Sequence, residues 1–178
     1  MHQPLTVAAA GITYVLAAVC YTRYRQKKFP TLAVWGTAFL VYALTSTGEL
    51  IWDVPLSLLG LAAGLTLGLL LSGSMLIYSQ KWEYHIGSAL IVLAVFISMA
   101  FELRWLRVIS IFTPIVLMFI IFGIGFYKTR NRVIALMIVG LVLLTMAGEF
   151  HSVYPEGYRF VDACGYLVML FALSGILK

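Results

Sequence analysis

The sequence predicts an all-α integral membrane protein with seven transmembrane helices, because it is too apolar for a water-soluble fold and its apolar stretches have helix length. Of its 178 residues, 62% are hydrophobic and 11% are charged, and the mean hydropathy is +1.01. Soluble domains carry about 25% charged residues. This composition excludes a water-soluble enzyme, a disordered chain and a nucleic-acid-binding module. We expect residues 1–178 to form one transmembrane domain with no soluble domain.

Seven apolar runs, separated by short polar segments, are the expected helices. They are Leu5–Tyr21, Leu32–Leu50, Pro55–Tyr78, His85–Phe101, Leu106–Tyr127, Val133–Phe150 and Phe160–Leu177. Each run has a length within the range of about 17–25 residues that is usual for a membrane-spanning helix. The strands of a barrel would alternate polar and apolar residues, whereas these runs are apolar all round.

The basic residues predict the orientation, because cytoplasmic loops carry an excess of Lys and Arg. Nine of the twelve lie on one side: Arg23, Arg25, Lys27, Lys28, Lys81, Lys128, Arg130, Arg132 and Lys178. The other side has Arg104, Arg107 and Arg159. The acids are distributed the opposite way, with Glu83 alone on the first side. We therefore expect an outside N-terminus and a cytoplasmic C-terminus in a multi-pass protein of the cell membrane.

The helix ends suggest an internal repeat. The second and sixth runs end in Thr45-x-x-Gly48-Glu49 and Thr145-x-x-Gly148-Glu149, and the fourth ends near Glu102. The first, third and fifth runs each end in a Tyr followed shortly by a basic residue. We interpret the chain as three tandem helical hairpins in parallel orientation plus a closing seventh helix. The alternative is that an interfacial Tyr followed by Lys or Arg is a general feature of membrane proteins.

The third run carries a small residue at every fourth position. These residues are Gly60, Gly64, Gly68 and Ser72. Such a stripe lets another backbone approach closely. We expect it either to make this helix central or to form a seam with a second copy or a membrane partner protein.

Three carboxylates near the outer helix ends are the main functional candidates. Glu49, Glu102 and Glu149 lie 16–18 residues from the inner starts of their helices, which is about 24–27 Å along each helix. Carboxylates at this depth are expected to face the bundle interior, a partner charge or water. Asp53, His151 and Asp162 are supporting candidates at the same outer mouth.

These acids have two interpretations. One is an outward-facing acidic vestibule that collects a small cation or solute, since rings of Asp and Glu serve cation pathways. The other is that they are solvated at the interface or paired with Arg104, Arg107 and Arg159. Six outer acids face three outer bases, so pairing alone does not neutralise the set. Whether the carboxylates bind a metal stays open, although oxygen ligands suit Ca²⁺ and Mg²⁺.

Several other chemistries are not expected. The last helix has no internal lysine for a retinal Schiff base, because Lys178 is the final residue. His85 and His151 fall in opposite leaflets, so one haem cannot bridge them. Cys20 and Cys164 also fall in opposite leaflets, so a disulfide between them is not expected. No residue is assigned a catalytic role, an enzyme is less favoured, and no cofactor is expected.

The sequence thus predicts a small polytopic membrane protein that binds or translocates a small cation or solute through the acidic vestibule. A scarcity of polar groups at mid-membrane argues against transport. The first alternative is a sensory, accessory or structural subunit of a larger membrane complex. The second is a lipid-modifying enzyme that uses the outer carboxylates and a divalent metal. The expected partners are the lipid bilayer and either a second copy or another membrane protein, and not nucleic acid.

Overall fold

A computed structural model describes residues 3–52, 55–77, 83–101, 103–153 and 158–175. Within these ranges the chain forms seven α-helices and no strand. The helices are α1 (Gln3–Lys27), α2 (Pro30–Ile51), α3 (Leu56–Met75), α4 (Glu83–Ala100), α5 (Arg104–Thr129), α6 (Arg132–Val153) and α7 (Tyr158–Ser174). Each corresponds to one of the seven apolar runs, so the prediction of an all-helical fold with seven helices is confirmed.

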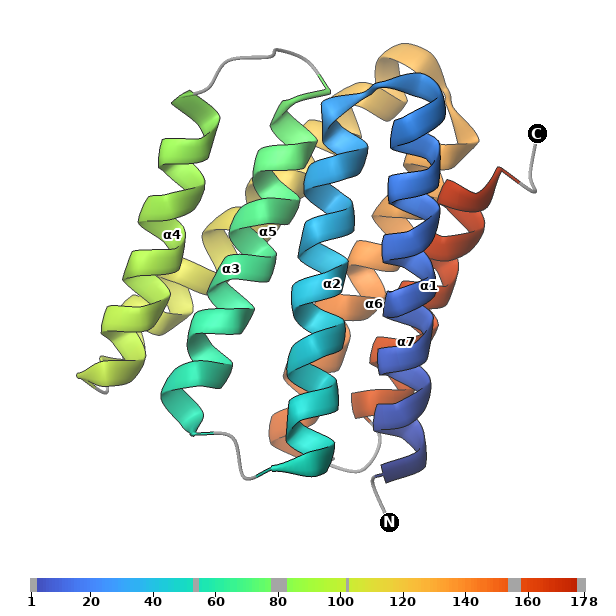
Figure 1. Cartoon of the computed structure of the whole chain (residues 1–178). Coiled ribbons are helices and arrows are strands. Elements are labelled where there is room, and N and C mark those ends of the chain that lie inside the picture. Colours follow the sequence, from blue (N-terminus) through green and yellow to red (C-terminus); the bar gives the residue numbers. More distant parts are fainter. Residues whose placement is uncertain (1–2, 53–54, 78–82, 102, 154–157, 176–178) are drawn as a thin grey trace.

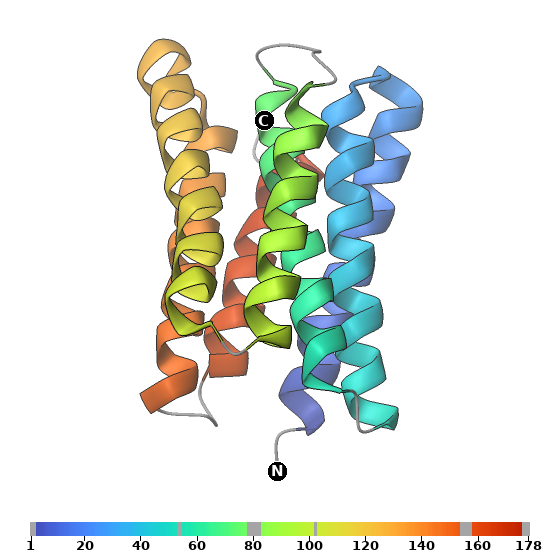
Figure 2. The same ribbon diagram turned by 90° about the vertical axis from the view of Figure 1, so that its left-hand side faces the viewer.

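The helices run up and down in turn and are arranged in a ring (Figure 1). Each helix packs against the next in the sequence, and α7 returns to pack against α1. At one place the ring is narrower, because α3 and α5 contact each other directly and α4 lies outside them. The view turned by 90° shows the same antiparallel arrangement of the bundle (Figure 2).

The turns after α1 and α5 have the same local geometry. Lys28 and Arg130 both adopt positive φ angles, 57° and 51°. The backbone N–H of each donates to the carbonyl four residues earlier, to Tyr24 at 2.7 Å and to Phe126 at 2.8 Å. Each basic side chain also lies over the ring of that aromatic residue, at 5.8 and 5.7 Å from the centroid. The two turns thus end their helices in the same way, while the internal repeat itself stays a prediction.

The core consists of large apolar side chains from the inner faces of the helices, such as Leu16, Phe39, Met118 and Met169. The backbones of α6 and α7 approach closely at a pair of glycines: a Cβ on Gly165 would lie 3.1 Å from the Gly140 carbonyl oxygen. Both cysteines are free; Cys20 is buried and Cys164 is partly exposed.

The small-residue stripe of α3 faces the interior of the chain. All four of its residues are buried, and the Ser72 side chain has no exposed surface. The helix packs against α2, α4 and α5. The stripe is therefore used within the chain, which leaves little of it for a seam with a second copy or a partner protein.

Three helices in the described part of the chain are long and apolar enough to cross a membrane. The qualifying segments are Pro4–Lys27, Leu58–Met75 and Val108–Thr129. The segment Arg132–Ala147 is apolar but shorter. Spans by the other four helices, and the orientation of the bundle, remain predictions.

Candidate functional site

Two of the six predicted site residues come together in the structure. Glu49 lies in the last turn of α2 and Asp162 lies one turn into α7, and both carboxylates face Arg159. Glu149 and His151 lie in the last two turns of α6, and their side chains are outside the described part of the structure. Asp53 and Glu102 are also outside the described residues.

Arg159 is the centre of this polar cluster. Its Nη2 atom donates to Glu49 Oε2, and its Nη1 atom donates to the Tyr42 hydroxyl at 3.0 Å. Nη1 also lies 3.7 Å from Asp162 Oδ2, which accepts the Tyr42 hydroxyl hydrogen. Only 9% of the Arg159 side chain is exposed, against 12% for Asp162 and 28% for Glu49. Of the two interpretations of the outer acids, this geometry agrees with pairing for Glu49 and Asp162.

Aromatic rings surround the cluster. The Arg159 guanidinium lies over the Tyr158 ring, 4.8 Å from its centroid. The ring of Tyr42 packs against that of Tyr166, with centroids 4.7 Å apart. Tyr166 is buried, and Tyr42 and Tyr158 are half-buried, so the rings cover part of the cluster and strengthen the ion pairs where they exclude water.

Helical spacing on α2 and α7 positions the cluster. Tyr42, Ser46 and Glu49 share one face of α2, and Arg159, Asp162 and Tyr166 share one face of α7. Among the described residues, the two backbones have no Cα atoms within 8 Å of each other. The long polar side chains therefore bridge a gap that the helices themselves do not close.

A cavity of about 600 Å³ lies inside the ring of helices next to this bridge. The wall formed by α2 and α7 is polar and carries the whole cluster together with Thr45 and Tyr158. The walls formed by α3, α5 and α6 are mainly aliphatic and aromatic: Leu59, Leu67, Leu70, Ile111, Phe112, Ile115, Leu141 and Leu144. A mostly apolar cavity with a few convergent polar groups is the usual form of a small-molecule site.

The described residues contain no group of three His, Cys, Asp or Glu side chains that could hold a metal ion. In the cluster, Glu49 and Asp162 are both engaged by Arg159. The arrangement is thus suited to holding a polar or charged group of a ligand beside a fixed set of charges.

Sequence reasoning missed the three tyrosines and gave Arg159 only a place among the outer bases. Two spacings could have indicated them. Tyr42 and Glu49 are seven residues apart, and Arg159 and Asp162 are three apart, so each pair shares a helix face.

Comparison with known proteins adds no relative: the chain matches no family model, no curated protein and no solved structure.

Proposed function

We propose that this chain is a cell-membrane protein with seven spans that binds a small solute inside its ring of helices. The observation that carries the proposal is the cavity of about 600 Å³, with the Arg159 cluster in one wall and apolar side chains in the others. Its volume lies within the range of about 300–1,000 Å³ that is usual for ligand pockets. The ligand places its polar group on the cluster and its apolar body against α3, α5 and α6.

Exposed apolar side chains support seven spans. Every helix exposes a large aliphatic residue in its middle part: Val15, Leu44, Leu65, Leu93, Val116, Val142 and Leu167. Exposed apolar surface on this scale would be unstable in water but is normal against lipid.

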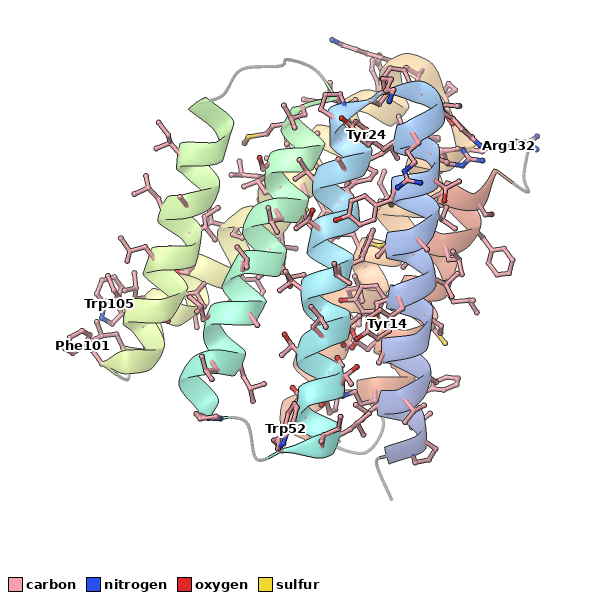
Figure 3. All side chains as sticks on the ribbon, in the orientation of Figure 1. Tyr14, Tyr24, Trp52, Phe101, Trp105 and Arg132 are labelled. Carbon is pink, nitrogen blue, oxygen red and sulfur yellow. The ribbon has the colours of Figure 1, made fainter. Side chains whose placement is uncertain are left out.

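Aromatic residues at the two ends support the same proposal. Trp52, Phe101 and Trp105 are exposed at the end of the bundle that holds the N-terminus, and Tyr24 lies at the opposite end (Figure 3). Tyr and Trp at both water interfaces are typical of membrane-spanning bundles. Arg132 also lies at the end with Tyr24, and the basic turns after α1 and α5 are at this end. By the positive-inside rule this end is cytoplasmic, so the Arg159 cluster lies toward the outside.

Binding is favoured over translocation. The described lining residues of α3 and α6 that lie farthest along their helices from the end with the cluster are Leu70 and Leu141. The hydroxyls of Thr66 and Thr145 donate to carbonyls of their own helices. A charged solute that moved on from the cluster would therefore lose hydration without replacement, which is costly.

A cavity-filling variant tests the proposal. Ala147 is buried in the cavity wall on α6, and its neighbour Met146 is 45% exposed. The protein is reconstituted in phosphatidylcholine nanodiscs and melted with 4-phenylbutylamine, 4-phenylbutanoic acid or 4-phenylbutan-1-ol. We expect at least one compound to raise the unfolding midpoint of the wild type and of Met146→Phe, but not that of Ala147→Phe. Ala62→Phe fills the cavity from α3 and serves as a second variant.

The proposal fails if none of the three compounds stabilises the wild type. It also fails if both cavity-filling variants are stabilised as much as Met146→Phe, because the compounds would then act through the bilayer.

A further inference from the structure

We infer that the ligand is an organic monocation, a protonated amine attached to an apolar body, whose ammonium group binds beside Glu49, Asp162 and Tyr42. This inference rests on the proposed function and specifies the ligand class of the same cavity. Three features of the lining support it: its net charge, the direction of its hydrogen bonds and its aromatic faces.

The charges of the cluster do not balance. Two carboxylates, Glu49 and Asp162, face the single guanidinium of Arg159, and no other Lys or Arg is among the described residues that line the cavity. The wall therefore has an excess of one negative charge. Asp162 is buried and 28% of the Glu49 side chain is exposed, so water stabilises the excess charge only in part and an opposite charge on a ligand stabilises it further. One positive charge on the ligand does so, whereas a carboxylate ligand would meet two like charges.

Four hydroxyls of the lining, those of Tyr42, Thr45, Thr66 and Thr145, donate their hydrogens to other groups of the chain. Each of three threonines donates to the carbonyl four residues earlier: Thr45 to Val41 at 2.8 Å, Thr66 to Ala62 at 2.9 Å and Thr145 to Leu141 at 2.8 Å. The Tyr42 hydroxyl donates to Asp162. A hydroxyl has one hydrogen and two lone pairs, so these groups present acceptors to the cavity.

Two N–H groups of Arg159 are used within the cluster, since Nη2 donates to Glu49 and Nη1 donates to Tyr42. The ligand group that complements the hydroxyl acceptors is one that donates several hydrogen bonds. An ammonium group has three donors and no acceptor.

The aromatic rings favour the same class of ligand. Tyr158 already carries the Arg159 guanidinium on its ring face, and Tyr42 and Tyr166 add two more rings to the same wall. Ring faces attract organic cations. An inorganic cation fits less well, because Ca²⁺ takes six to eight oxygen ligands and the opposite walls are hydrocarbon.

The three phenylbutyl compounds test the inference, because they share a tail and differ in the charge of the head group. At pH 7 in nanodiscs, we expect the amine to bind the wild type at least about ten times more tightly than the alcohol or the acid, measured by calorimetric titration. Glu49→Gln removes the excess charge and should reduce the preference for the amine over the alcohol about tenfold. Glu49→Asp keeps the charge and should keep the preference. Thr145→Val removes a hydrogen-bond acceptor without changing the charge. It should weaken the binding of the amine about threefold and leave the binding of the acid unchanged.

Equal binding of the amine and the alcohol would overturn the inference, since it would mean that one carboxyl is protonated and the cluster is neutral. Tighter binding of the acid would overturn it as well. In both cases the cavity still binds a solute, so the proposed function stands. If no compound shows binding that depends on Ala147 and Ala62, the proposed function fails together with the inference.

Discussion

At the scale of single residues, Glu49 and Arg159 occupy helix ends that disfavour their charges. Glu49 lies in the last turn of α2, at the negative end of the helix dipole, and Arg159 is the second residue of α7, at the positive end. Each placement costs about 0.3–1 kcal/mol. The ion pair between them offsets both costs, so these residue types suit the contact between the helices better than they suit the helices themselves.

Removing the guanidinium should therefore destabilise the bundle. Arg159→Gln leaves Glu49 and Asp162 without their positive partner beside the cavity. Breaking a buried ion pair on one side costs about 3 kcal/mol or more. We expect a fall of about 3 kcal/mol in the free energy of unfolding, measured by denaturant titration in detergent. Arg132→Gln is the control, because Arg132 is exposed and has no recorded ion pair among the described residues.

The reason for the loss can be checked with a double variant. Arg159→Gln combined with Glu49→Gln removes one of the two uncompensated carboxylates and should recover part of the lost stability. A single Arg159→Gln variant as stable as Arg132→Gln would show that the cluster contributes nothing to the fold.

The cluster could be predicted only in part from the sequence. Helical spacing predicts that Arg159 and Asp162 share a face and that Tyr42 and Glu49 share another. Nothing in the pattern predicts that these two faces meet, because the pairs are separated by more than 100 residues and α2 and α7 are not in direct backbone contact. The expected depth of a charged residue can be counted along its own helix. The residue with which it pairs depends on which helices face each other in the ring.

At the scale of helices, two different sequence patterns let the backbones of neighbouring helices pack closely. The stripe on α3 is visible in the sequence because it repeats every fourth residue, and its residues are buried. The contact between α6 and α7 depends on Gly140 and Gly165, one on each helix, which form no repeat. A single glycine in the sequence does not predict a close helix contact, because the helix that it faces is not known from the sequence.

Alanine substitutions at two glycines should show what the close approach of α6 and α7 contributes to stability. A Cβ on Gly165 would lie 3.0 Å from the Leu144 side chain and 3.1 Å from the Gly140 carbonyl oxygen. We expect Gly165→Ala to cost about 1–2 kcal/mol of stability, because the backbones of α6 and α7 must separate. At Gly123 a Cβ meets nothing within 4 Å. Gly123→Ala should be neutral or stabilising by up to about 1 kcal/mol, since alanine is the better helix former.

Thermal unfolding of both variants in the same detergent gives the comparison. Equal midpoints for Gly165→Ala and Gly123→Ala would mean that the crossing of α6 and α7 relaxes without cost.

At the scale of the whole molecule, the helices were predictable and the cavity was not. Each apolar run forms one helix, in which the backbone hydrogen bonds of the run are satisfied within the segment itself. The order of neighbours around the ring also follows the sequence, as short loops require. The cavity between α2, α3, α5, α6 and α7 depends on how well the side chains of these five helices fill the interior together. The sequence of one helix does not show which side chains it will face.

Orientation is the property on which the role of the site depends, since the cluster can meet an external solute only if its end of the bundle faces outside. Trp52 lies at that end and is 70% exposed, and Lys128 lies at the opposite end and is also exposed. Single-cysteine variants Trp52→Cys and Lys128→Cys are made after Cys20 and Cys164 have been replaced by alanine. In intact cells, a membrane-impermeant maleimide should label Trp52→Cys only, and permeabilisation should expose Lys128→Cys.

The reverse pattern would place the basic turns outside and the Arg159 cluster in the cytoplasm, so that its solute would be an intracellular one. Labelling of both variants in intact cells would mean that an even number of helices crosses the membrane between Trp52 and Lys128, which would contradict the seven-span topology. The expected pattern also requires an odd number of spans between the two sites. α3, α4 and α5 lie between Trp52 and Lys128. The experiment therefore tests whether α4, which does not qualify as a span among the described residues, crosses the membrane together with α3 and α5.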